Sequence, residues 1–164
     1  MAKQLKEKFG GLDAVFVNAG VAQFRPVKYF DEATFNRVMS INLKGPYFLI
    51  QALMPLLANP SSIVLNASIS AHAGAPDSSV YAASKAGLIS LVRTLSGELI
   101  GRGIRVNAIS PGPVATPIYN KMGLTRPCSE SPKNKQDKVS PADSISDVIA
   151  RFVQNESNKA YLHR

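Results

Sequence analysis

The stretch "SSIVLNAS" (residues 61–68) places a continuous apolar run, IVL, between small and polar residues. A short β-branched run bounded in this way is typical of a strand buried on both faces of a parallel sheet. Two similar runs lie on either side of it in the sequence, "LDAVFVNAG" (12–20) and "IRVNAISPG" (104–112). The sequence therefore predicts three buried strands, each of which ends in small or polar residues.

Helical patterns separate the three predicted strands. The first covers residues 31–58, where Gly45 and Pro46 should kink or divide the helix. The second is "SSVYAASKAGLISLVRTLSGEL" (78–99), which is followed by the glycine stop signal "GRG". Buried strands that alternate with helices favour right-handed crossovers. We therefore predict an α/β fold, a Rossmann-like three-layer arrangement with a doubly wound parallel sheet.

The domain organisation follows from changes in composition along the 164 residues. Residues 1–120 should form a partial Rossmann-like domain that contains the candidate site. Residues 121–143 are rich in Ser, Pro and Lys and predict a polar loop or a disordered segment. Apolar residues with helical spacing then predict an amphipathic helix over residues 144–156, within a C-terminal unit of helix and tail that covers 144–164.

Composition and charge exclude several classes of protein. The single cysteine, Cys128, cannot form an internal disulfide or a cysteine-based metal cluster, which favours a reducing, cytoplasmic location and no metal. No apolar run is long enough to span a bilayer. The net charge of +8 is spread as +5 over residues 1–120 and +3 over residues 121–164, without a dense basic run. We therefore expect neither a nucleic acid nor a membrane as a partner.

Tyr81 and Lys85 are the centre of the candidate chemistry. A spacing of four residues places both side chains on one face of a helix. A nearby lysine cation favours the phenolate, so the tyrosine pKa should fall from about 10 towards neutrality, as acid–base catalysis requires. Ser68, at the end of the preceding strand, can reach the same substrate oxygen, and Asn42 could hold a water on the lysine. The implied reaction is carbonyl–alcohol interconversion, with the hydride supplied by a cofactor.

Each of these elements also has an ordinary structural explanation. A tyrosine and a lysine four residues apart occur by chance in many helices, where the lysine side chain extends along the surface to solvent. Asn18-Ala19-Gly20 alone would be a turn, and Ser68 alone a hydroxyl that bonds to the backbone. Their combination at the ends of consecutive predicted strands is more specific, because ligands of parallel α/β sheets bind at the carboxyl ends of the strands.

With these motifs in their order, the chain resembles the short-chain dehydrogenase/reductase family. "VNAG" (17–20) resembles the N-N-A-G turn of that family, with Val17 in place of the first asparagine. "INLKG", "LNASISAHAGAP", "YAASKAG" and "NAISPGPVATP" follow with the spacing of the family. The resemblance extends from about residue 10 to residue 120.

The resemblance implies a role for each matching residue. Tyr81 would be the acid/base, Ser68 would hold the substrate oxygen, and Lys85 would lower the tyrosine pKa and bind the nicotinamide ribose. Asn42 would hold a water of the proton relay. NAD or NADP would be bound by Tyr81 and Lys85 together with residues at and after the strand ends: Asn18, Ala19, Gly20, Pro111, Gly112, Val114 and Thr116. The substrate would be a small alcohol or ketone, and the helices over 31–58 and 79–100 would form the face of a homo-oligomer.

The sequence departs from the family pattern at both ends. Nothing resembles the glycine-rich turn T-G-x-x-x-G-x-G, which receives the pyrophosphate, so the adenosine half of the cofactor site is expected to be missing and the choice between NAD and NADP has no visible determinant. The segment 125–140 matches no family motif. Two hypotheses remain open at this point: a truncated oxidoreductase, and a cofactor-deficient, non-enzymatic remnant that pairs with a full-length relative through its long helices.

Overall fold

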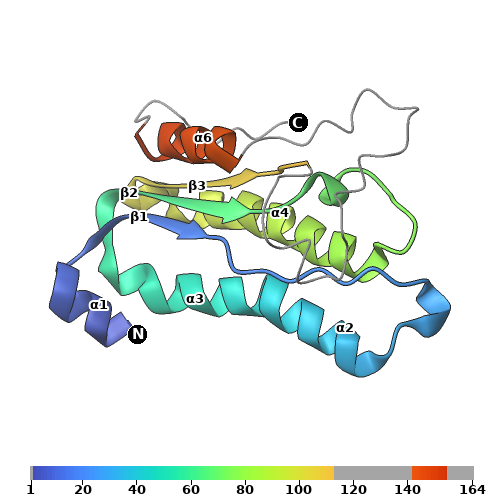
Figure 1. Cartoon of the computed structure of the whole chain (residues 1–164). Helices are drawn as coiled ribbons and strands as arrows, with labels where there is room; N and C mark the ends of the chain where they lie inside the picture. The colour runs from blue at the N-terminus through green and yellow to red at the C-terminus, as the bar shows by residue number, and fades with distance from the viewer. Residues whose placement is uncertain (1, 113–141, 155–164) are drawn as a thin grey trace.

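The computed structural model describes residues 2–112 and 142–154. Three strands, β1 (Leu12–Val17), β2 (Leu57–Asn66) and β3 (Ile104–Ile109), form a parallel sheet in the order β1-β2-β3 (Figure 1). Ile63 of β2 pairs with Val15 of β1 and with Val106 of β3. The parallel sheet with helical crossovers confirms the predicted Rossmann-like α/β class.

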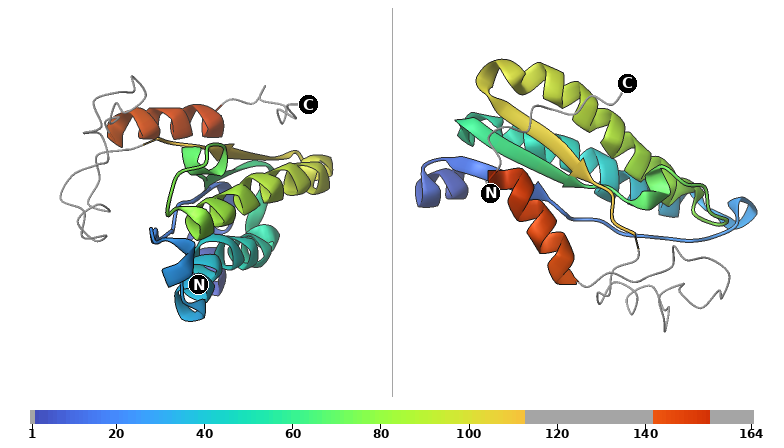
Figure 2. Two further views of the ribbon diagram at one scale, coloured as in Figure 1. Left: turned by 90° about the vertical axis from the view of Figure 1, so that its right-hand side faces the viewer. Right: turned by 90° about the horizontal axis from the view of Figure 1, so that it is seen from above.

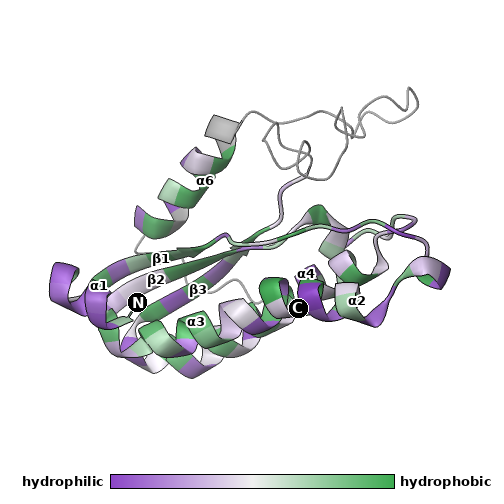
Figure 3. Cartoon of the chain, turned by 60° about the horizontal axis from the view of Figure 1, so that its bottom comes forward, coloured by the Kyte–Doolittle hydropathy of each residue, from purple (hydrophilic) through white to green (hydrophobic). Residues whose placement is uncertain are grey.

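Helices cover both faces of this sheet. The helices α2 (Glu32–Met39), α3 (Gly45–Leu53) and α4 (Ser79–Leu99) lie on one face, and α6 (Ala142–Gln154) lies over the other (Figures 1 and 2). The hydrophilic helix α1 (Ala2–Phe9) stands at the end of the sheet where the strands begin (Figures 1 and 3). All three strands therefore end on the side of the molecule opposite to α1.

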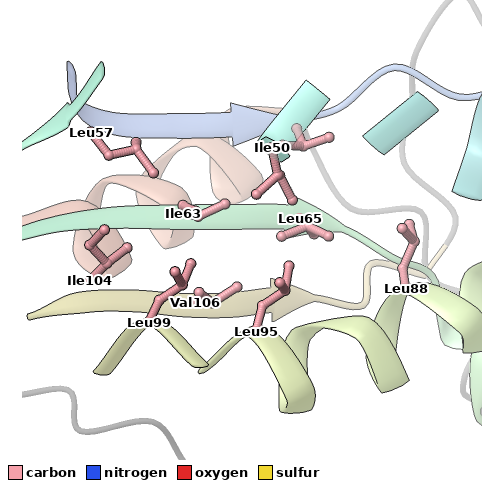
Figure 4. Packing of buried hydrophobic residues seen from close by; sticks show 10 residues of the cluster. Ile50, Leu57, Ile63, Leu65, Leu88, Leu95, Leu99, Ile104 and Val106 are labelled. Carbon is pink, nitrogen blue, oxygen red and sulfur yellow. The ribbon is translucent and has the colours of Figure 1, made fainter. Parts of the chain in front are cut away.

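The hydrophobic core lies between the sheet and the layer of α3 and α4. Ile63 and Leu65 of β2 are 1% and 0% exposed, and they face apolar side chains from α3, α4 and β3 (Figure 4). Other buried members of this cluster are Val17, Ile50, Leu57, Leu88, Leu95, Leu99, Ile104 and Val106. Because β2 is the central strand, its apolar run is buried on both faces, as predicted.

The first strand is less buried than its sequence predicts. Of its six residues only Val17 is buried, and Phe16 is 38% exposed. Among the described residues, β1 pairs with β2 alone and forms one edge of the sheet. An apolar run is therefore compatible with an edge strand, and the prediction that this strand is buried was wrong.

The long helical pattern over residues 31–58 is divided, as Gly45 and Pro46 predicted, but the break lies in the preceding turn. Residues Ser40–Lys44 form a π-helical turn between α2 and α3, in which the Gly45 N–H donates to the Ser40 carbonyl. Pro46 has no N–H to donate to the carbonyl of Asn42, and the backbone widens at that point. The local sequence thus places Asn42 in a helical irregularity.

The end of the same pattern was predicted incorrectly. The helix α3 ends at Leu53 and is followed by the 3₁₀ turn Met54–Leu56, while Leu57 and Ala58 already belong to β2. Leu57 pairs with Leu12 of β1, which extends the sheet by several residues before the apolar run. Pairing with a distant strand decides this boundary, and the apolar periodicity of the segment alone does not reveal it.

The C-terminal helix agrees in position with its amphipathic pattern. α6 spans Ala142–Gln154, two residues earlier than the predicted 144–156. Arg105 of β3 donates from Nη2 to the Val153 carbonyl at 3.1 Å, which ties α6 to the sheet. Residues 113–141 and 155–164 lie outside the described residues. Within the described ranges, no helix combines the length and hydropathy needed to cross a bilayer.

Gly103, in the connection between α4 and β3, and Gly97, within α4, allow a matched test of the role of glycine in that connection. Gly103 has φ +68, a left-handed conformation that penalises a side chain, and an added Cβ would lie 3.4 Å from Pro60 Cβ. Gly97, within α4, has open space around it. We expect Gly103→Ala to lower the free energy of unfolding by about 1–2 kcal/mol and Gly97→Ala to raise it by about 0.5–1 kcal/mol in urea denaturation. Equal changes in the free energy of unfolding of the two variants would contradict a special conformational role of Gly103.

Candidate active site

The predicted catalytic residues lie around the ends of the strands. Ser68 follows β2, Tyr81 and Lys85 lie in the first turns of α4, and Asn42 lies in the π-helical turn before α3. α4 begins beside the carboxyl ends of the strands and runs back along the sheet (Figure 1). The fold thus brings together residues that come from three separate segments of the chain.

Lys85 is a buried amine with one identified protein acceptor. Its side chain is 4% exposed, and Nζ donates to the backbone carbonyl of Asn66 at 2.6 Å. Burial disfavours the charged form and lowers the pKa of Lys85 from 10.5 to about 8. Nζ also lies over the Tyr81 ring, 5.8 Å from its centroid. The amine therefore has a pKa well below that of a free lysine and lies beside the ring of Tyr81.

Asn42 connects the loop after β1 with α4. This side chain is fully buried, and its Nδ2 donates to the Val21 carbonyl at 2.8 Å and to Ser84 Oγ at 3.0 Å. Its Oδ1 accepts from the Val21 N–H, also at 2.8 Å. Ser84 Oγ in turn donates to the Tyr81 carbonyl. Asn42 therefore holds a backbone segment in place, a structural task that the sequence pattern did not predict and that is separate from the expected water-holding role.

Ser68 lies in a loop that is held against the end of β3. The serine is 8% exposed, and its Oγ accepts from the Ser70 N–H at 3.2 Å. On either side of it, the Ala67 N–H donates to the Ile109 carbonyl at 2.8 Å and the Ile69 N–H donates to the Pro111 carbonyl at 3.0 Å. These two bonds continue the β2–β3 pairing past the strands and fix the Ser68 backbone.

A second polar contact spans the same two loops. Nε2 of His72 lies 3.0 Å from Ser110 Oγ, at the position just before the Pro111-Gly112 turn. The turn expected to hold a nicotinamide and the loop that carries Ser68 are therefore joined by side chains as well as by backbone. Val114 and Thr116, which were predicted for the same role, lie outside the described residues.

Gly20 brings the backbone close to the lysine amine. A Cβ at this position would lie 3.4 Å from Lys85 Nζ and 3.5 Å from Asn42 Oδ1. Asn18, Ala19 and Gly20 are all exposed at the end of β1. A surface of this kind allows a ligand to approach the amine closely, as the ribose of a nicotinamide nucleotide would. Within the described part of the chain, the residues at the strand ends therefore fit the nicotinamide half of such a cofactor.

Two residues near the site were missed by sequence reasoning. Asn66 accepts from Lys85 through its main chain, and its Nδ2 donates to Asn18 Oδ1 at 2.6 Å. The place of Asn66 at the end of β2, opposite "VNAG", was a signal for its side-chain contact with Asn18. It was no signal for the main-chain contact with Lys85, because every residue has a backbone carbonyl. The other is Phe24, whose ring lies 5.6 Å from the Tyr81 ring between centroids. No spacing rule links these two aromatic residues.

Neither residues 2–112 nor 142–154 contain a group of three or more His, Cys, Asp or Glu side chains that could hold a metal ion.

Comparison with known proteins shows the family. A family model described as enoyl-(acyl carrier protein) reductase matches residues 1–157. The 3-oxoacyl-(acyl-carrier-protein) reductase FabG of Thermotoga maritima is 35% identical over 160 residues, which cover 96% of this chain and 65% of that protein. Levodione reductase of Leifsonia aquatica is 32% identical over 165 residues, which cover 93% of this chain and 61% of that protein.

Solved structures agree with the sequence comparison. The crystal structure of levodione reductase matches with a TM-score of 0.80 at 31% identity, over 92% of this chain and 62% of that one. The crystal structure of a dehydrogenase/reductase from Sinorhizobium meliloti 1021 matches with a TM-score of 0.69 at 32% identity, over 71% and 47%. The chain belongs to the short-chain dehydrogenase/reductase family. It spans less than two thirds of the length of each of these relatives.

Proposed function

We propose that this protein is an NAD(P)-dependent oxidoreductase that interconverts a carbonyl and an alcohol, with Tyr81 as the acid/base. The observation that carries the proposal is the buried amine of Lys85, which lies 5.8 Å from the centroid of the Tyr81 ring. Burial of an amine costs free energy, so a buried lysine beside a tyrosine at the ends of parallel strands indicates a function that offsets this cost. Acid–base catalysis by the tyrosine is such a function. The relatives named as reductases support the same reaction class.

In this mechanism the side chains move one proton. During reduction, the Tyr81 hydroxyl gives its proton to the substrate oxygen, and the ammonium of Lys85 stabilises the phenolate that remains. Ser68 donates a hydrogen bond to the same oxygen and fixes the orientation of the carbonyl. The Asn66 carbonyl holds the lysine amine in place at 2.6 Å. Oxidation of an alcohol uses the same groups in the reverse direction.

The cofactor would lie over the strand ends. Asn18, Ala19 and Gly20 would border it on one side, Pro111 and Gly112 on the other, and Lys85 would bind the ribose next to the nicotinamide. The nicotinamide supplies or accepts the hydride, a reaction that no amino-acid side chain performs. The closeness of Gly20 to the lysine supports this placement, because a side chain at this position would lie against the lysine amine, 3.4 Å from Nζ at its Cβ.

Turnover of simple carbonyls tests the proposed function. The purified chain should reduce an aryl or alkyl ketone with NADH or NADPH, and the absorbance of the reduced nicotinamide should decrease in step with the alcohol formed. Binding of each dinucleotide should be measured in parallel by isothermal titration calorimetry. Absence of turnover despite saturating cofactor binding would overturn the proposed function. Absence of both would indicate that this chain does not itself form the cofactor site.

We also propose that the outer faces of α2, α3 and α4 mediate self-association. They line a groove of about 550 Å³, which includes Leu43, Tyr47, Phe48 and Leu91. Tyr47 and Phe48 are 46% and 49% exposed, and α3 contains several residues coloured as hydrophobic in Figure 3. A surface with exposed aromatic residues of this kind is typical of a protein–protein interface.

The oligomeric state can be tested by one substitution. Phe48→Glu should shift the mass in size-exclusion chromatography with light scattering from a dimer or larger species to a monomer, because a buried charge without a partner opposes association. Phe9→Ala, a change of a phenylalanine on α1 that is 57% exposed, should leave the mass unchanged. A wild-type monomer at micromolar concentration would contradict the proposed interface.

A further inference from the structure

Phe24 lies in a loop segment that is anchored on both sides. Three residues before it, both backbone groups of Val21 are bonded to the Asn42 amide at 2.8 Å. Immediately after it, the Arg25 N–H donates to the Asp77 carbonyl at 2.9 Å, which ties the loop to the segment that leads into α4. The backbone that carries Phe24 is therefore fixed relative to the helix that carries Tyr81.

The Phe24 side chain uses this fixed position to contact Tyr81. The two rings lie 5.6 Å apart between centroids with an interplanar angle of 62°, an edge-to-face geometry. This geometry is the favoured arrangement for a pair of aromatic rings. Phe24 nevertheless remains 43% exposed. An apolar surface thus lies open to solvent directly beside the hydroxyl-bearing ring.

The charged neighbours of Phe24 are engaged elsewhere. The guanidinium of Arg25 pairs with Asp31 at 3.0 Å, and the Lys28 amine lies over the Tyr29 ring at 4.6 Å. Ile69, the residue after Ser68, is 49% exposed. The Tyr81 ring therefore has an exposed apolar side chain in contact with it, and Ser68 has one as its neighbour in the sequence. This environment suits a carbon skeleton better than it suits a phosphate or a carboxylate.

We propose that Phe24 positions the Tyr81 ring and selects carbonyl substrates with an apolar, preferably aromatic, group next to the reacting carbon. The inference rests on the proposed function, in which Tyr81 protonates the substrate oxygen. With that oxygen at Tyr81 and Ser68, one substituent of the carbonyl carbon covers the exposed part of the Phe24 ring. The contact with Tyr81 limits rotation of the phenol, so Phe24 acts on both binding and orientation.

The kinetic test compares two ketones as probes, acetophenone and acetone. Phe24→Ala should lower the ratio of kcat/KM for acetophenone over acetone by about 10-fold, mainly through KM for acetophenone, because a pocket contact of this size gives discrimination of that order. Phe24→Leu should recover part of the ratio, and Phe9→Ala should leave it unchanged. A ratio that stays within about twofold of wild type in Phe24→Ala would overturn the proposed selectivity, as would equal losses for both ketones.

A spectroscopic test separates this inference from the proposed function. The chain has five tyrosines, so labelling with 3-fluorotyrosine should give five ¹⁹F resonances, of which Tyr81→Phe removes the one from Tyr81. Acetophenone should shift that resonance at a lower concentration than acetone does in wild type, and Phe24→Ala should move and broaden it and remove this difference between the two ketones. These results would support the role of Phe24 even in a chain without turnover. A Tyr81 resonance indifferent to Phe24→Ala would overturn it.

Discussion

Replacement of Tyr81 by phenylalanine is expected to lower kcat/KM for ketone reduction by about 100- to 10,000-fold, which is the usual contribution of a positioned general acid or base. The substitution removes only the hydroxyl and keeps the ring that contacts Phe24. KM for the cofactor should change little, because Lys85 keeps its bond to Asn66. Steady-state kinetics with both nicotinamide cofactors would measure the effect.

Tyr47→Phe is the matched control for this change. Tyr47 lies on the outer face of α3 and is 46% exposed, so loss of its hydroxyl should leave kcat/KM within about twofold of wild type. Thermal unfolding of both variants should match that of wild type within a few degrees. Reductase activity that survives Tyr81→Phe would refute the assignment of the acid/base.

Lys85→Met should cause a loss of similar size and should also change the pH dependence. Because the pKa of Lys85 is about 8, the cation that stabilises the phenolate is present below that pH and is lost above it. The wild-type profile of kcat/KM for reduction should therefore fall as pH rises through about 8. The methionine variant has no amine to titrate, so its residual activity should lack this feature. A fall near pH 8 in both proteins would assign it to another group.

The same lysine makes a pH-dependent contribution to folding stability. Its pKa in the folded state lies below the unfolded value of 10.5, so between about pH 8 and 10.5 the unfolded chain binds the additional proton. The contribution of this group to stability therefore rises with pH across this window, by about 3 kcal/mol in all, and is smallest below pH 8.

The methionine variant isolates this contribution. The difference in unfolding free energy, wild type minus Lys85→Met, should increase between pH 8 and 10.5 in urea titrations at several pH values. A constant difference for Lys85→Met would contradict the lowered pKa.

Much of the fold was predictable because local patterns and pairing agree. The apolar run of β2 is buried on both faces, and the glycine stop after α4 adopts the left-handed conformation at Gly103. The spacing of Tyr81 and Lys85 placed both residues on one side of α4, as the contact of the amine with the ring indicates. In these cases, residues close in sequence determine the structure.

The remaining features depend on contacts between distant segments. The start of β2 at Leu57 is decided by pairing with β1, and the exposure of Phe16 by the position of that strand at the edge of the sheet. The bonds of Asn42 to Val21 and Ser84 join residues 21 and 42 positions apart. Side-chain types in one segment do not encode such partners, which explains why the structural task of Asn42 was missed.

The bond from Lys85 to the main chain of Asn66 has a consequence for how this site can vary in evolution. Any amino acid at position 66 offers the same carbonyl, so substitutions there can preserve the anchor of the lysine as long as the strand keeps its path. A comparison of homologous sequences would then find the lysine invariant and its anchor variable. Selection would act on the backbone geometry of β2, and the residue types that maintain it could differ from one lineage to the next.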